Sequence, residues 1–399
     1  MNEAEWRRLI SWRPPRETLQ SGIGTWLGLF TAVLLLIHAG APSPLIIACL
    51  VGVTCVLMAA LRWRIGLIAV IVLLVAGLAL RASLTAIGSD VLTVTRAAID
   101  LALSGGNPYG HGFAESRPPG APYAYGPVAL LWYLPARTDP VRLELLVSYA
   151  LLGLLAARGR MLGLAVYATM PALIATASDG SNDTSAGLLI LIALLLALRS
   201  PWVGAFALAV ASAFKLYALA WLPPLLVYGG VATLLPFLAG TLLTWGPAVL
   251  LWDPKNILTS LQQAEAIHDN SFYSLAFAVG ERFGLPRTAF DVGRYVAGGL
   301  LAASSWSFVR SARSFIVVGV AVFLATLFLG WWSTYAYFAA IAPVICWHLD
   351  DWLGLPRVVW PTDPVGRLTT FVDRRWPVRR PWAEGPLATP DVSSAPTQP

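Results

Sequence analysis

The stretch RASLTAIGSDVLTVTRAAIDLALSGGNPYGHGFAESRPPGAPYAYGP, residues 81–127, is the first long polar segment of the chain and follows three apolar segments. A helix is predicted over residues 89–104, because Ser89-Asp90 is a start signal and Gly105-Gly106-Asn107-Pro108 is a turn signal. Several polar or ionisable side chains in the stretch are candidates for chemistry: Asp90, Arg96, Asp100, Asn107, Tyr109, His111, Glu115, Arg117, Tyr123 and Tyr125. We expect any chemistry of this protein to begin here.

The composition of the chain is that of a membrane protein. Of its 399 residues, 57% are hydrophobic and 12% are charged, and the mean hydropathy is +0.68. Apolar runs of about bilayer length recur between residues 22 and 349, and lipid requires each to form a helix because it offers no partners for backbone polar groups. We predict an all-α, polytopic transmembrane bundle of about 12 helices. Residues 1–21 form its cytoplasmic start, 22–349 the multi-pass domain, and 350–399 an Arg- and Pro-rich cytoplasmic tail that is partly disordered.

The positive charge of the chain indicates topology rather than nucleic-acid binding. The net charge is +6, and most basic residues are Arg in short connections beside apolar segments. Such residues favour the cytoplasmic side of a membrane. We therefore expect the lipid bilayer, and no nucleic acid, as a partner. No HExxH, paired CxxC, P-loop or GxGxxG pattern is present in the sequence, so neither a metal nor a cofactor is predicted.

The predicted topology brings three polar segments to the outer face. Counting crossings from a cytoplasmic N-terminus puts residues 81–127, 178–184 and 252–287 outside. Residues 126–135 are short for a span, and we interpret them as a broken or half-inserted helix. A shared external cavity is the natural inference from this arrangement.

Asp90 and Lys215 are the sharpest candidates. A carboxylate just after the third span is partly desolvated and suited to take a proton from a hydroxyl, although Asp90 also fits as a cap of the following helix. Lys215 is in the apolar run FALAVASAFKLYALAW, where an ammonium needs a partner such as a phosphate or must snorkel outward. Arg96 and Asp100 are four residues apart and favour a helix-surface ion pair.

The remaining candidates each have two interpretations. Asp179 and Asp183 fit either as helix caps or as ligands for sugar hydroxyls. Tyr109, Tyr123 and Tyr125 fit either an interfacial aromatic belt or sugar stacking. The segment HDNSFYSL, residues 268–275, groups polar side chains before an apolar turn.

The pattern of these motifs resembles the polyprenol-phosphate-sugar-dependent membrane glycosyltransferases of the GT-C superfamily, particularly glycosyltransferase family 87. The resemblance is in an outward Asp after an early span, a helix ending in GGNPYG, and YAYGP with a further Pro. It continues in SNDTSAGLLIL, in GAFALAVASAFKLYALAWLPPLL and in HDNSFYSL. Where related mannosyltransferases often show Gly-His-Asn-Asp, this chain has Gly180-Ser181-Asn182-Asp183, so any role of a His there is lost.

The resemblance implies an inverting transfer of a hexose, most simply mannose, from a polyprenyl-phosphate donor to an envelope lipid or glycan acceptor on the extracytoplasmic face. It implies Asp90 as the base, and Lys215 with His268 or Arg96 at the donor phosphate. The residues that it implies for binding the sugar or the acceptor are Asn107, Tyr109, Tyr123, Tyr125, Asp179, Asn182, Asp183, Asn270 and Ser271. An arabinofuranosyl donor is an alternative, and a transporter or flippase of envelope precursors is the alternative from another class.

Overall fold

The fold is all-α. A computed structural model describes residues 66–83, 88–266 and 271–354, and 77% of these residues are helical and 1% are in strands. The all-α prediction is therefore confirmed at this level. The expected cytoplasmic start, the first two expected spans and most of the expected tail lie outside the described residues.

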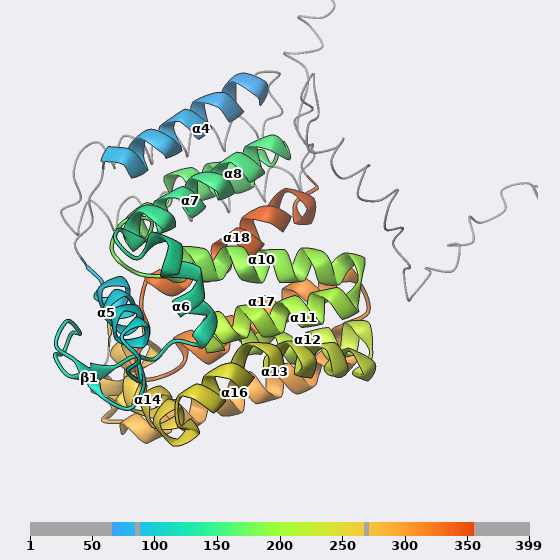
Figure 1. The fold of residues 1–399 in the computed structure, drawn as a ribbon. Coiled ribbons are helices and arrows are strands. Elements are labelled where there is room, and N and C mark those ends of the chain that lie inside the picture. The colour runs from blue at the N-terminus through green and yellow to red at the C-terminus, as the bar shows by residue number, and fades with distance from the viewer. Residues whose placement is uncertain (1–65, 84–87, 267–270, 355–399) are drawn as a thin grey trace, which may run out of the picture.

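The longer helices run roughly side by side (Figure 1). They are α4 Gly66–Ser83, α7 Pro140–Ala157, α10 Asp183–Arg199, α11 Pro201–Phe214, α13 Leu234–Leu251, α16 Arg287–Phe308, α17 Ala312–Phe328 and α18 Ala336–Trp352. The shorter helices are α5 Val91–Leu103, α6 Pro127–Tyr133, α8 Met161–Thr169, α9 Pro171–Ala175, α12 Leu222–Gly229, α14 Pro254–Ala266 and α15 Glu281–Phe283. Helices α5 and α14 lie at one end of the long helices, next to a hairpin of β1 Gly112–Phe113 and β2 Ala121–Pro122.

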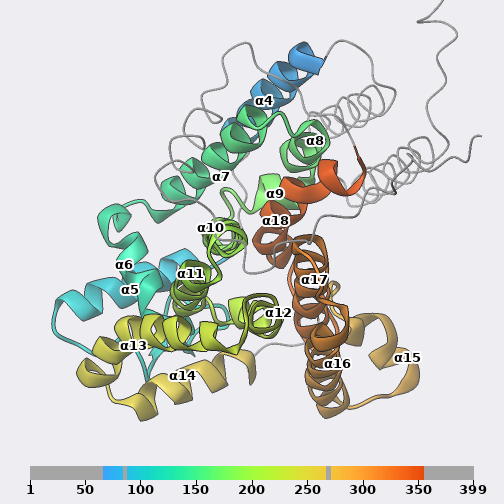
Figure 2. The ribbon, with the colours of Figure 1, turned by 90° about the vertical axis from the view of Figure 1, so that its right-hand side faces the viewer.

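Viewed from the side, α12 lies between the α11 and α13 pair and the α16 and α17 pair (Figure 2). Helix α11 ends at Phe214. Lys215, the next residue, has an extended backbone, and a 3₁₀ turn at Leu216–Trp221 leads into α12. Pro223 and Pro224 occupy the first turn of α12, where the missing N–H groups of proline cost no helical hydrogen bond. The break leaves Lys215 at a helix end rather than inside a continuous span.

Two helices in the described part of the chain are both long and apolar enough to cross a bilayer, Pro140–Ala157 and Val231–Leu251. Helix α6 has seven residues and is followed by a 3₁₀ turn at Leu134–Ala136, so it is too short to span. The expectation that residues 126–135 form no full span is thus confirmed. The total of about 12 crossings stays a prediction.

Arg81 was expected to begin the polar outer segment 81–127. In the structure it is not part of a loop. It belongs to α4 and is 1% exposed. Its guanidinium donates to the carbonyl oxygens of Tyr167 at 2.6 Å and Leu173 at 3.4 Å, and to Ser148 Oγ at 2.7 Å. Since Pro171 starts α9, the last carbonyls of α8 lack partners within their own helix, and Arg81 supplies donors for them.

Candidate functional site

A cavity of about 790 Å³ opens at the end of the bundle near α5. The outer segment expected at residues 81–127 lines it through residues 88–94 and 116–125, the segment 178–184 through Asp179, Ser181 and Asp183, and the segment 252–287 through Leu261. The three segments therefore share one cavity, and its place on the outer face stays a prediction. Its lining also includes Lys215 and residues of α16, α17 and α18.

Asp90 lines this cavity with a carboxylate that does not cap a helix. The residue precedes α5, but its side chain makes no capping hydrogen bond, and Ser89 Oγ accepts from Val91 N at 3.3 Å instead. Among the described residues, Oδ2 of Asp90 accepts from the backbone N–H of Arg117 at 2.5 Å. The capping interpretation of this side chain is therefore wrong, and the half-buried carboxylate faces the hairpin and the cavity.

The loop before α10 is bound to the start of α5 through its backbone. Ser89 N donates to Asp179 O at 2.7 Å, and Leu92 N donates to Gly180 O at 2.9 Å. Gly180 has φ +91°, and a Cβ there would lie 2.4 Å from Ser89 O. Both the backbone conformation and the close approach require glycine. This contact brings Asp179 next to the turn that carries Asp90.

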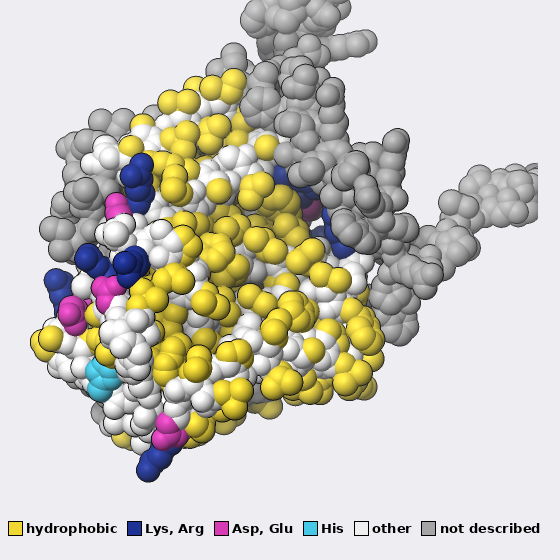
Figure 3. Space-filling model, in the orientation of Figure 1, with side chains coloured by type: hydrophobic (Ala, Val, Ile, Leu, Met, Phe, Trp, Pro, Cys, Tyr) yellow, Lys and Arg dark blue, Asp and Glu magenta, His cyan; other side chains and the backbone are white. Residues whose placement is uncertain are grey.

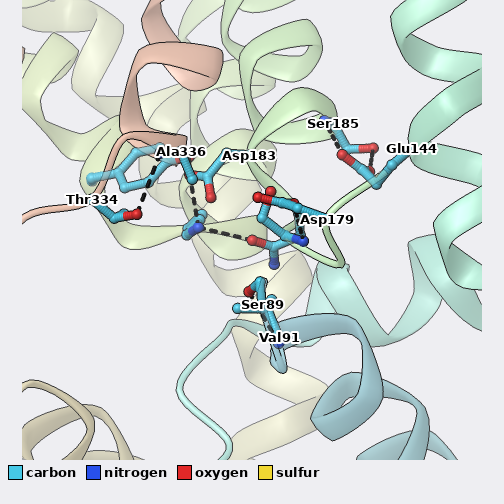
Figure 4. Close-up of polar contacts among 12 residues, drawn as sticks. Ser89, Val91, Glu144, Asp179, Asp183, Ser185, Thr334 and Ala336 are labelled. Atoms are coloured by element: carbon cyan, nitrogen blue, oxygen red, sulfur yellow. Dashed lines mark hydrogen bonds and ion pairs between the residues drawn. The ribbon is translucent and has the colours of Figure 1, made fainter. Parts of the chain in front are cut away.

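Asp179 is buried and belongs to a polar network across the cavity. Its Oδ1 accepts from Ser181 N at 2.8 Å and its Oδ2 from Tyr335 Oη at 2.5 Å. Burial raises the pKa of the Asp179 carboxyl, while the hydrogen bonds from Tyr335 and Ser181 act in the opposite direction. Figure 4 shows Asp179 and Asp183 between the Ser89–Val91 turn and the Thr334–Ala336 turn. Asp179 therefore joins elements that are far apart in the sequence.

Lys215 has a carboxylate partner. Its Nζ lies 2.8 Å from Asp183 Oδ1 and 2.8 Å from Asn182 Oδ1, and its side chain is 12% exposed. The aromatic rings of Tyr125, Tyr217 and Tyr337 surround the ammonium, with centroids 5.3, 5.1 and 5.8 Å away. The cation is thus held by an ion pair and three ring faces. The expectation that it needs a partner is confirmed, but the partner in this structure belongs to the protein.

The three tyrosines of the first polar segment differ in position. Tyr125 lines the cavity, and burial raises the pKa of its hydroxyl, with the charges of Asp183 and Asp90 adding to the shift. Tyr109 and Tyr123 are 1% and 0% exposed and pack edge to face beneath the cavity. Tyr109 Oη donates to Tyr125 O at 3.0 Å. Tyr109 and Tyr123 therefore support the cavity wall, and only Tyr125 is placed to stack on a ligand.

Arg96, Asn107 and Ser271 are not among the residues that line the cavity. Arg96 is 56% exposed on the surface of α5 and lies 3.9 Å from Asp100, so its expected role at the donor phosphate is corrected to that of a surface pair. Asn107 Oδ1 accepts from Tyr109 N at 2.9 Å and shapes the turn. Ser271 Oγ donates to Ser333 O, which holds two loops together. His268 and Asn270 lie outside the described residues.

Two arginines of the cavity had not been assigned a role from the sequence. Arg117 extends from the hairpin, and Arg294 projects from α16, where it is 7% exposed and donates to Tyr295 Oη at 3.1 Å. Helix α16 also carries Arg287 and Asp291, and Asp291 lies 3.8 Å from Arg294, so the sequence around Arg294 favours a helix-surface ion pair and did not single it out. Within the described ranges, no three His, Cys, Asp or Glu side chains are grouped as metal ligands. The expectation of no metal stays a prediction.

The lining of the cavity thus combines three carboxylates, those of Asp90, Asp179 and Asp183, with Lys215 and two arginines. Carboxylates and tyrosines suit hydroxyl groups, and guanidinium groups suit phosphate oxygens. Comparison of the chain with family models, with curated proteins and with solved structures found no match. The chemistry of the cavity is therefore inferred from its own side chains.

Proposed function

We propose that this protein is a polytopic membrane glycosyltransferase with about 12 crossings and an extracytoplasmic active site. It moves a hexose, most simply mannose, from a polyprenyl-phosphate donor to a hydroxyl of an envelope lipid or glycan. The observation that carries the proposal is the position of the Asp90 carboxylate: it caps no helix, accepts from the backbone N–H of Arg117, and lines one cavity together with Lys215, Arg117 and Arg294.

The exposed apolar surface supports a membrane location. On α13 the side chains of Leu242 and Leu250 are 73% and 88% exposed, and on α16 Leu300 is 68% exposed. Figure 3 shows apolar side chains across the middle of this face, with charged side chains towards its left edge, near α5 and the hairpin, at the bottom, and at the upper right. Soluble monomers rarely expose an apolar area of this extent, and lipid tails remove its cost.

The arrangement of the arginine turns supports the orientation. The cavity is lined near the start of α10 and α18 and near the end of α17, and Lys215 directly follows α11. The turns at residues 199–200 and 310–313 lie at the opposite ends of α10, α11 and α17, and the turn at residues 158–160 lies beside the opposite end of α18, where Arg160 pairs with Asp351. Arg in such turns favours the cytoplasmic side, which leaves the cavity on the outer side.

The proposed reaction uses the Asp90 carboxylate and the cationic side chains of the cavity lining. Asp90 takes the proton of the acceptor hydroxyl as its oxygen attacks the anomeric carbon of the donor. The bond from that carbon to the phosphate oxygen breaks, and the polyprenyl phosphate leaves with the electron pair. Arg294 and Arg117 stabilise the charge on the departing phosphate. Lys215 contributes less to this charge than expected, because its ion pair with Asp183 at 2.8 Å is closer than the pair of Arg294 with Asp291 at 3.8 Å.

The test is transfer by the purified full-length protein in lipid nanodiscs, supplied with labelled polyprenyl-phosphate mannose and envelope lipid extract. The wild type is expected to form a mannosylated product, and Asp90→Asn to lower turnover by about 10³-fold, the scale of losing a general base. Arg294→Gln is expected to raise the KM for the donor. Asp100→Asn is the matched control, because this carboxylate is 53% exposed on the next turns of the same helix, away from the cavity.

Three results would contradict the proposal. Normal turnover by Asp90→Asn would remove this carboxylate from the mechanism. Product from an arabinofuranosyl donor alone would overturn the choice of a hexose. Translocation of intact donor across a vesicle membrane, with no new glycosidic bond, would indicate a transporter in place of an enzyme.

A further inference from the structure

Glu144 is a buried carboxylate that lies outside the cavity and that the proposed reaction does not use. It is on α7 and is 1% exposed. Its Oε1 accepts from Tyr133 Oη at 2.5 Å and from Ser185 Oγ, and its Oε2 accepts from the backbone N–H of Ser185 at 3.0 Å. Trp132 Nε1 donates to the same Ser185 Oγ at 3.0 Å. One carboxylate therefore joins α6, α7 and α10.

The contact with Ser185 is made at a helix start that its own N-cap leaves open. Asn182 precedes α10 but makes no side-chain capping bond, so the first N–H groups of α10 need acceptors from elsewhere. Glu144 supplies one from a neighbouring helix. Figure 4 shows the Glu144–Ser185 contact apart from Asp179 and Asp183. The first turn of α10 is thus held by Glu144 on one side and presents Asp183 to Lys215 on the other.

We propose that Glu144 is a positioning residue that holds the first turn of α10, and with it Asp183, so that the Lys215 ammonium stays paired beside the cavity. The role of this device in sugar transfer rests on the proposed function. The positioning itself does not, because the pairing of Lys215 is a property of the folded protein.

The charge of a carboxylate strengthens these contacts. Glu144 accepts from two hydroxyl groups, which can also accept, and from the Ser185 N–H, which can only donate. An amide can still offer its oxygen to Ser185 N and its NH₂ group to the hydroxyls, but hydrogen bonds to a charged acceptor are roughly twice as strong as neutral ones. Glu144→Gln therefore keeps the size of the side chain and weakens the hold on the first turn of α10.

A second carboxylate in the chain provides a matched control. Asp350 on α18 accepts from Leu162 N at 3.0 Å and from Gly163 N at 2.9 Å, and so caps α8 from a neighbouring helix in the same way. It is fully buried. It lies 13 residues after Tyr337, which is about 20 Å along α18 from the cavity. Asp350→Asn removes an equivalent cap without touching the cavity.

The chain also contains a built-in reporter, because Lys215 and Lys255 are its two lysines. Lys255 is exposed on α14, whereas Lys215 is paired and surrounded by rings. A paired, protonated ammonium reacts slowly with an amine-directed ester. The ratio of labelling at Lys215 to labelling at Lys255, read by peptide mass spectrometry on the full-length protein in nanodiscs, therefore measures how well Asp183 is placed.

The expected result is a rise of the labelling ratio by about tenfold in Glu144→Gln, the factor that corresponds to replacing a hydrogen bond to a charged acceptor by one to a neutral acceptor. Ser185→Ala keeps the backbone contact and is expected to raise the ratio less. Asp183→Asn is the positive control and raises it directly. Asp350→Asn is expected to leave the labelling ratio at the wild-type value, although this variant loses thermal stability because α8 loses its cap.

An unchanged ratio in Glu144→Gln, with a clear rise in Asp183→Asn, would overturn the proposal and leave Glu144 as a structural cap. If Glu144→Gln does not fold, the labelling ratio of Ser185→Ala is the test. An unchanged ratio in Ser185→Ala would then overturn the proposal. The labelling needs no transfer activity, so it separates the two proposals. A wild type without transfer but with a Glu144-dependent ratio would refute the proposed function alone.

Discussion

The ion pair between Asp183 and Lys215 is expected to have a large coupling energy, which a double-mutant cycle measures. The two side chains are 3% and 12% exposed, and their charged atoms are 2.8 Å apart. Removing one partner of a buried pair typically costs about 3–5 kcal/mol, because the other charge is left buried. Lys215 keeps Asn182 Oδ1 and the tyrosine rings as partners, so the cost here is expected near the lower limit.

The cycle consists of the wild type, Asp183→Asn, Lys215→Met and the double variant. Each single variant leaves one buried charge without its counter-ion, and the double variant leaves none. The expected coupling energy is therefore about 2 kcal/mol, with the double variant less destabilised than the sum of the single variants. The assay is equilibrium unfolding in mixed micelles, followed by tryptophan fluorescence.

The pair of Arg96 and Asp100 is the control for this cycle. Its side chains are 56% and 53% exposed and its charged atoms are 3.9 Å apart. Exposed pairs of this kind couple by at most about 0.5 kcal/mol. A coupling energy for Asp183 and Lys215 as small as that of the control pair would refute the assignment of a buried, mutually neutralising pair.

Two further predictions concern the loop before α10. Gly180→Ala is expected to lower the free energy of unfolding by about 1–2 kcal/mol or more, because φ is +91° and the added Cβ meets Ser89 O. Gly153→Ala in α7 meets no atom within 4 Å and is expected to be neutral or stabilising in the same unfolding assay, so equal losses in both would contradict the argument. For Asp179, burial raises the pKa in the folded state, so its protonated form favours folding. The stability that depends on this proton is full below the unfolded pKa of about 4 and is lost as pH rises through the folded pKa. Asp179→Asn is expected to flatten this part of the stability profile, and identical profiles for the variant and the wild type would contradict it.

Much of the helical architecture was predictable because its causes are local. The expected helix at 89–104 is α5 Val91–Leu103, and the short helix expected at 126–135 is α6 Pro127–Tyr133. In both cases apolar content determines where a helix forms, and Gly, Asn and Pro determine where it stops. The short α6 was recognisable because its apolar run is too brief for a bilayer.

The assignment of polar side chains to the cavity was only partly predictable. Asp90, Tyr125, Asp179, Asp183 and Lys215 line it, as expected from their segments. Arg96 was assigned to the donor phosphate from the family resemblance, yet α5 turns it to the surface. Arg294 was overlooked, yet α16 turns it to the cavity. The direction of a side chain depends on the rotation of its helix against its neighbours, which no short motif records.

The sequence by itself determined an all-α chain, the places of α5 and α6, and three of the segments that contribute to the cavity, because hydrophobicity and helix breaking act over a few residues. Only the tertiary structure decided the partners: Lys215 with Asp183, Asp90 with the backbone of Arg117, and Glu144 with the start of α10. These contacts join residues that are 27 to 41 positions apart. Such contacts exist only where packed helices hold the groups within hydrogen-bond distance and away from water.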